Sequence, residues 1–187
     1  HLPVLVVTKG NRMIRTIKRG LPFIFSNYAL AGATTSLSVA DAIVDLNAEL
    51  LSGLVLSQLV RKGAPIIMGS MLAFLDMKKF AEFYGEYSFI ANAACAEMMS
   101  FYQKPHAGTS GAGVGFGMDI IQAENYVLNM YTETTGKTGW GPFIGGSLGS
   151  STFSPESLVY VNELIERATR FAMGVSMKKD DSYLDEM

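Results

Sequence analysis

Short apolar segments alternate with longer helical segments along most of the chain, and this alternation limits the possible folds most strongly. Residues 21–25 (LPFIF) and 65–70 (PIIMGS) are apolar runs of strand length, residues 106–109 (HAGT) form a weaker run, and residues 139–146 are a fourth candidate. A segment long enough for a crossover helix follows each of them. This pattern predicts parallel strands joined by right-handed helical connections.

The helix expected between the first two strands has clear start and stop signals. Hydroxyl residues at 35, 36 and 38 can cap its N-terminus, and Gly63 followed by Pro65 predicts its end near Arg61. Further helices are predicted over about 76–83, 87–103 and 119–134, and from Ser154-Pro155 to about 173.

About four strand–helix units fit either an open doubly wound sheet or part of a (β/α)8 barrel. A full barrel takes about 250 residues, so four units correspond to about half of one. We expect a single domain over residues 1–187. The sequence starts at His1 rather than at a methionine, so we expect the gene to begin upstream.

The composition argues against disulfide-rich, nucleic-acid-binding and membrane-spanning proteins. The net charge is −2 and the sequence has no long basic cluster, so nucleic acid binding has no electrostatic support. The longest apolar run, 37–60, contains Asp41, Asp45 and Glu49, which are costly inside a bilayer. The single cysteine, Cys95, is expected to be a small buried hydrophobe, and we expect a cytoplasmic protein.

The segment 106–119 (HAGTSGAGVGFGMD) has five glycines within ten residues. Such a loop needs either unusual backbone dihedrals or room for something to approach the backbone. It lies between a strand and a helix, but it has neither G-x-G-x-x-G spacing nor a Lys-Ser/Thr ending for phosphate binding. Asp119 would also repel a phosphate at the start of the next helix. A mobile loop without a ligand is the alternative interpretation.

Other patterns that carry chemistry are weak. The sequence has two histidines, no H-E-x-x-H pair for zinc and no G-x-S-x-G around a serine. Asp41, Asp45 and Glu49 recur every four residues, which is typical of the solvated side of a helix, and Glu49 is the one that could face inward. Three aromatic residues fit either core packing or a cage for a quaternary ammonium group: Trp140, Phe143 and Phe153.

Three segments resemble the trimethylamine methyltransferase family. Residues 32–70, GATTSLSVADAIVDLNAELLSGLVLSQLVRKGAPIIMGS, are similar to a family run of the form G-A-T-A-P…N-A-E-x-L-A-G-x-V-L-A-Q-L-x-R-x-G-A-P-x-x-Y-G. FIANAACAEMMSFYQKP and TFSPESLVYVNELI continue the resemblance, which covers about 20–174. It implies a (β/α)8 barrel that transfers a methyl group from a methylated amine to Co(I) of a separate corrinoid protein. Since family members are much longer, the chain would be an internal piece, roughly the C-terminal-side half of the barrel.

The glycine-rich loop departs from the family pattern. The archaeal trimethylamine enzymes have a pyrrolysine in about this region, and the usual loop is similar to G-G-x-x-D-S-K-x-P-D-A-Q-A-G-Y-E. Asp119, Gln122 and Glu124 match its second Asp, its Gln and its Glu, whereas small residues replace the first Asp and the Lys. The resemblance therefore implies a betaine-type substrate, because a quaternary nitrogen leaves as a neutral amine without a proton donor or an adduct.

Barrel enzymes catalyse at the C-terminal ends of their strands, so substrate contacts are expected there. The expected contacts are Asn27, Tyr28, Ser70, His106, Thr109, Ser110 and Trp140. The loop glycines expected to let the corrin ring approach are Gly108, Gly111, Gly113, Gly115 and Gly117. His106 is expected either to hold a carboxylate or to bond to backbone, and no catalytic residue is identified.

The corrinoid is expected to be carried by the partner protein, with no metal or cofactor held by this chain, and a homo-oligomer is expected. Two alternatives belong to other classes of protein. One is an inactive piece of a barrel, whose unpaired strand edges could be hidden by dimerisation. The other is an α/β domain that binds a small molecule and has no role in methyl transfer.

Overall fold

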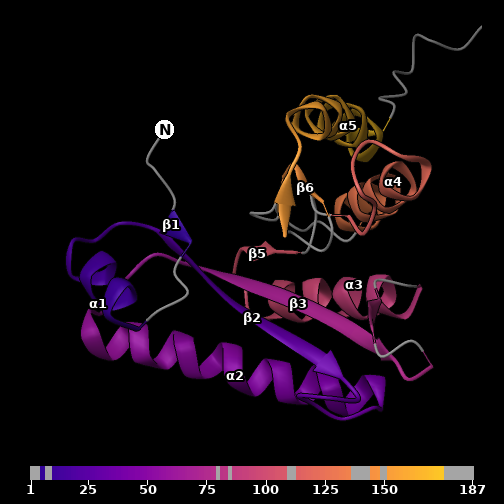
Figure 1. Cartoon of the computed structure of the whole chain (residues 1–187). Coiled ribbons are helices and arrows are strands. Elements are labelled where there is room, and N and C mark those ends of the chain that lie inside the picture. The colour runs from indigo at the N-terminus through magenta and orange to yellow at the C-terminus, as the bar shows by residue number, and fades with distance from the viewer. Residues whose placement is uncertain are drawn as a thin grey trace, which may run out of the picture.

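The computed structural model describes residues 5–6, 10–78, 81–83, 86–108, 113–135, 144–147 and 151–174. Figure 1 shows how its helices and strands are arranged. They are β1 (Leu5–Val6), α1 (Gly10–Lys18), β2 (Phe23–Ala31), α2 (Val39–Val60), β3 (Ile66–Asp76), β4 (Ala81–Phe83), α3 (Glu86–Phe101), β5 (His106–Ala107), α4 (Ile120–Thr135), β6 (Gly146–Ser147), β7 (Thr152–Phe153) and α5 (Pro155–Met173).

Parallel pairing joins β1 to β2, β2 to β3 and β3 to β5. This confirms the parallel arrangement predicted for the three apolar runs and the α/β class of the fold. Strands β1 to β5 form an open sheet, without barrel closure in the described part of the chain. None of the described helices is long and apolar enough to cross a bilayer.

The predicted ends of two helices are confirmed. Ser38 has extended backbone dihedrals and its hydroxyl accepts a hydrogen bond from the N–H of Asp41, which caps α2. Gly63 takes a φ of +77°, the left-handed conformation that glycine adopts after a helix. Ser154 caps α5 in the same way as Ser38 caps α2, and Pro155 occupies its first turn.

The predicted helix over 76–83 is wrong. Residues Ala81–Phe83 form β4, which pairs antiparallel with the end of β3 so that Phe83 lies opposite Phe74. Directly after β3, the N–H of Lys78 donates to the Asp76 carboxylate at 2.8 Å. Pairing the end of a long strand therefore outweighs the helix propensity of a segment too short to form a stable helix alone.

Two further differences concern the ends of the chain. The predicted fourth parallel strand is wrong over its described part, because β6 pairs antiparallel with β7 in a separate two-stranded sheet. The pair β1 and α1 was not predicted, although the buried residues of α1, Met13, Thr16 and Ile17, recur at helical spacing.

The main core lies between one face of the parallel sheet and the helices α1, α2 and α3 (Figure 1). Alternate residues of β2 and β3 enter it, together with Leu46 and Leu50 of α2 and Cys95 and Met99 of α3. A second, smaller cluster joins α4 to α5 around the fully buried Tyr126. The buried thiol of Cys95 confirms its expected place in the core.

Candidate functional site

The strand β5 ends near the middle of the longer strands β2 and β3. Ala107, its last residue, pairs with Gly69, and the next rung of the ladder pairs Asn27 with Ser70. The expectation that Asn27, Tyr28 and Ser70 lie at strand ends is therefore wrong. Both of their strands continue several residues beyond this level, because backbone pairing extends past the apolar runs that the sequence shows.

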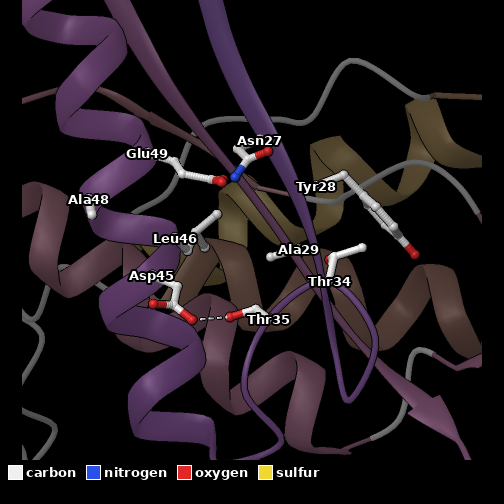
Figure 2. Close-up of a pocket in the computed structure, with 9 residues that line it drawn as sticks. All are labelled: Asn27, Tyr28, Ala29, Thr34, Thr35, Asp45, Leu46, Ala48 and Glu49. Carbon is white, nitrogen blue, oxygen red and sulfur yellow. Dashed lines mark hydrogen bonds between the residues drawn. The ribbon is translucent and has the colours of Figure 1, made fainter.

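The two faces of the sheet separate the predicted substrate contacts. Ser70 and His106 lie on the face covered by helices, where Ser70 Oγ is 2.6 Å from His106 Nε2. Asn27 faces α2, whereas Tyr28 points away from that helix (Figure 2). Since successive strand residues point to opposite faces, no single site can hold all four side chains.

The face opposite α2 and α3 is called the open face below. It carries the side chains that alternate with those of the core: Ile24, Ser26, Tyr28, Leu30, Ile67, Gly69, Met71 and Ala73. A Cβ added to Gly69 would meet Ser26 and Ile24, which shows that these residues share a face. Tyr28 is 37% exposed and lies beside Met71 in the ladder. None of the open-face side chains is charged.

The side chain of Asn92 of α3 hydrogen-bonds to the backbone of β3 at Leu72, between the segments of β3 that pair with β5 and with β4. Its Oδ1 accepts from the N–H of Leu72 at 3.4 Å and its Nδ2 donates to the carbonyl of Leu72 at 3.3 Å. The same amide donates to the carbonyl of Ser88 at 2.8 Å and accepts from Ser70 Oγ at 3.4 Å. The side chain thus acts as a peptide group between β5 and β4. Sequence reasoning missed Asn92, and its signal was a lone amide inside the apolar stretch FIANAACA.

The polar groups around Asn92 are neutral. Burial lowers the pKa of His106 to about 4, and burial raises the pKa of the Cys95 thiol to about 11 against the opposing hydrogen bond with Ser70. At neutral pH neither a thiolate nor an imidazolium is present there. The cluster therefore pairs the backbone of Leu72 and the hydroxyl of Ser70, leaves the buried Nδ1 of His106 without a partner among the described residues, and offers no activated nucleophile.

A pocket of about 310 Å³ lies between β2 and α2 (Figure 2). Asp45 and Glu49 line it from α2, and Thr35 donates a hydrogen bond to Asp45 at 2.5 Å. Within the described part of the chain, the buried Nδ2 of Asn27 has no hydrogen-bond partner, and it points toward the Glu49 carboxylate (Figure 2). The two carboxylates suit a cationic ligand better than an anionic one.

The acidic side of α2 agrees with the sequence expectation. Asp41, Asp45 and Glu49 are all exposed, which confirms the solvated side of the helix. Glu49 is exposed as well as pocket-lining, so it does not enter the core.

Asp119, which directly precedes α4, and Gln122 of α4 shape residues 113–119 of the glycine-rich loop. Asp119 accepts from the N–H groups of Gln122 at 2.8 Å and Phe116 at 2.9 Å, and these bonds lower the pKa of its carboxyl. Gln122 is fully buried and accepts from the N–H of Gly115 at 2.9 Å. It donates to the carbonyl of Gly146 at 2.8 Å, which fixes the loop to β6.

Four glycines of the segment 106–119 are described: Gly108, which is buried directly after β5, and Gly113, Gly115 and Gly117, which have different surroundings. A Cβ at Gly113 would overlap the amide of Gln122, and a Cβ at Gly115 would overlap the Asp119 carboxylate. A Cβ at Gly117 would meet nothing within 4 Å. None of the three has a positive φ. Close packing against α4 therefore explains Gly113 and Gly115 without an approaching ligand, and Gly117 is the glycine with open space beside it.

Several predicted positions lie outside the described residues: Thr109, Ser110, Gly111, Trp140 and Phe143. Phe153, the third candidate for an aromatic cage, lies on β7 and is 63% exposed. Among the described residues, no group of three or more His, Cys, Asp or Glu is arranged to hold a metal ion.

The family model of trimethylamine methyltransferase (MTTB) matches residues 7–187. The chain belongs to this family. It is 31% identical over 105 residues to trimethylamine methyltransferase MttB of Desulfitobacterium hafniense, covering 55% of the chain and 21% of that protein. It is 27% identical over 178 residues to MttB of Methanosarcina thermophila, covering 94% of the chain and 35% of that protein. A glycine betaine methyltransferase of Desulfitobacterium hafniense is 30% identical over 122 residues, covering 64% of the chain and 25% of that protein.

The chain thus spans about a third or less of the length of these three relatives. Asp119 and Gln122, two of the residues through which the sequence resembles the family's loop, both bond to the backbone of residues 115 and 116.

Proposed function

We propose that the full-length protein transfers a methyl group from a betaine-type quaternary amine to Co(I) carried by a corrinoid protein. We also infer that the open sheet forms part of a (β/α)8 barrel in that protein. Membership of the trimethylamine methyltransferase family supports both statements. The glycine betaine methyltransferase among the relatives supports this class of substrate.

The side chains of the described loop residues, 113–119, favour a quaternary over a tertiary amine as the substrate. Asp119 is its only titratable side chain, and two backbone N–H groups hold it as a carboxylate. No acid is therefore present in residues 113–119 to protonate a leaving amine. A quaternary amine needs none, because the carbon–nitrogen bond breaks with its electron pair on nitrogen and a neutral tertiary amine leaves.

The loop end around Gly117 fits the approach of a broad, flat ring. The space beside Gly117 is open, and Phe116 next to it is 86% exposed. The corrinoid supplies the nucleophilic cobalt, and the loop leaves room for the macrocycle at this point. A displacement of about 1 Å can cost about 100-fold in rate, so clearance matters to methyl transfer.

Tyr28 on the open face is the proposed contact for the trimethylammonium group. Its ring can attract a cation, and the neighbouring Met71 and Ser26 add no charge. Methyl groups on nitrogen donate no conventional hydrogen bonds, so an aromatic and uncharged surface suits them. Ser70, His106 and Asn27 lie on the other face, and their roles as substrate contacts stay predictions.

The test uses the full-length enzyme with its corrinoid protein in the Co(I) state. Absorbance of the methylated corrinoid should increase with glycine betaine and not with trimethylamine. The Tyr28→Leu variant should weaken betaine binding by about 2- to 30-fold, which corresponds to about 0.5–2 kcal/mol of cation–π attraction. Tyr87→Leu is the matched control, since Tyr87 is exposed on α3 and packs against Phe74. Methylation from trimethylamine alone would contradict the proposal.

The acidic pocket favours a second candidate, the binding of a small cation without methyl transfer. In that case tetramethylammonium should bind, and Glu49→Gln should weaken its binding. Tyr28 also lines this pocket, so the response of the Glu49 variant is the one that discriminates. The first candidate predicts that Glu49→Gln leaves betaine binding unchanged while Tyr28→Leu weakens it. Calorimetric titration of both variants with tetramethylammonium and with glycine betaine separates the candidates.

A further inference from the structure

The helix α2 is apolar on the side that faces away from the sheet. Its buried residues, among them Leu46 and Leu50, pack on β2 and β3. On the opposite side Val44 is 64% exposed, Val55 is 57% exposed and Leu59 is 79% exposed. Ala48 and Leu51 lie between them at helical spacing. This exposed apolar strip lies beside the acidic side of α2, and a contiguous exposed apolar patch is a candidate contact surface.

This outer face of α2 is defined by Val44, Ala48, Leu51, Val55 and Leu59, and its spacing is self-complementary. Val44 and Leu59 are equally far from the midpoint between Leu51 and Ser52. Ala48 and Val55 are also equally far from it. An antiparallel pair of α2 helices crossing at this midpoint would therefore place Val44 of each copy opposite Leu59 of the other. Ala48 and Ser52 are small and permit close approach of the two helices.

The charges at the two ends of α2 fit the same arrangement. Asp41 in the first turn and Lys62 just after the helix are both exposed. They are also equally far from the midpoint between Leu51 and Ser52. At about 1.5 Å of rise per residue they are about 30 Å apart within one chain, so they cannot pair there. An antiparallel partner brings each Asp41 near the other Lys62 and sets opposite helix-dipole ends side by side.

We propose that a second copy of this protein covers the outer face of α2, with the two α2 helices antiparallel about a two-fold axis near Ser52. The interface is isologous, so one self-complementary patch serves both copies. The competing occupant is another segment of the full-length protein. The apolar residues and the charges are both placed symmetrically about the midpoint of α2. This favours a second copy, because binding to a different segment would not need a symmetric arrangement.

The first experiment is thiol cross-linking of the full-length protein. Ser52→Cys places a thiol at the proposed axis, and Glu97→Cys places one at an exposed position of α3 as the control. The buried Cys95, with its raised pKa, contributes little background, which the unmodified protein measures directly. Under mild oxidation we expect a covalent dimer with Ser52→Cys only. Absence of that dimer, or equal yields from both variants, would overturn the proposal.

The second experiment measures association by sedimentation. Val44→Lys should weaken self-association at least tenfold, whereas Val159→Lys on α5 should leave it within twofold. The two valines are both 64% exposed, so they differ in location and not in burial. Equal effects of the two substitutions, or a parent protein that is monomeric at every concentration, would contradict the proposal.

A charge exchange tests the pairing of the two ends. Asp41→Lys and Lys62→Asp should each weaken association, and the double variant should recover it at least in part. Recovery requires contact between copies, because the two positions are too far apart within one chain. Additive weakening in the double variant would count against the antiparallel arrangement.

Discussion

Replacing Gly115 and Gly117 in turn by alanine should change stability in opposite directions, although the two residues are neighbours in one loop. A Cβ at Gly115 would meet the Asp119 carboxylate and the Cβ of Gln122, and the latter is too close to the helix backbone to move away. Overpacking of this kind costs about 1–3 kcal/mol. Turning the Asp119 carboxylate away also weakens the cap of α4, worth about 1 kcal/mol.

Gly117 has neither constraint. A Cβ there meets nothing within 4 Å and its φ is not positive, so alanine fits the native backbone. Alanine restricts the unfolded chain, which should stabilise the protein by about 0.4–1 kcal/mol. The two variants should therefore differ by about 3 kcal/mol in the free energy of unfolding.

Urea denaturation measures this difference. With a slope of about 2 kcal/mol per molar urea, the midpoints of the two variants should differ by about 1.5 M, with the parent protein between them. Equal midpoints would show that the contacts of Asp119 and Gln122 with Gly115 do not determine the conformation of the loop. If Gly117→Ala lost as much stability as Gly115→Ala, a side chain at position 117 would have to meet a neighbouring group, and the claim of open space beside Gly117 would be refuted.

Three other outcomes are expected. Asn92→Leu leaves the N–H and C=O of Leu72 unpaired and should cost about 2–4 kcal/mol in urea denaturation, whereas the exposed Asn162→Leu should change stability by less than about 0.5 kcal/mol. Because burial lowers the pKa of His106 from 6.5 to about 4, its contribution is complete above pH 6.5 and should decline as the pH falls toward 4, by about 3 kcal/mol; His106→Gln should remove this slope. Gly117→Leu should fold normally and slow methyl transfer in the full-length enzyme, and an unchanged rate would exclude clearance at this position.

Much of the fold could be predicted where local chemistry determines it. Ser38, Gly63 and Pro155 mark helix ends through groups that bond within a few residues, so their sequence context is sufficient. The parallel pairing followed from apolar runs separated by crossover helices. Residues 81–83 could not be predicted in the same way, because their strand depends on the free edge of β3, a partner set by the tertiary fold.

The candidate site was harder to predict because strand faces alternate with every residue. The apolar run at 21–25 indicates a strand, but Asn27 and Tyr28 follow it, and their directions depend on how far the strand continues. A shift of one position along the strand decides whether a side chain points toward α2 or lies on the open face. The loop is a similar case, since glycine at 113 and 115 indicates a close approach without saying that Gln122 and Asp119 make it.

Gln122 gives the glycine-rich loop a property that its composition would not suggest. The side chain ties Gly115 to β6, and Val114 is bonded to Asn125 of α4, so the described residues of the loop share the rigidity of that helix. The entropy of ordering this backbone is lost when the protein folds, before any ligand arrives. A partner that docks against residues 113–117 therefore meets a preformed surface and avoids the ordering cost that a flexible loop would impose on association.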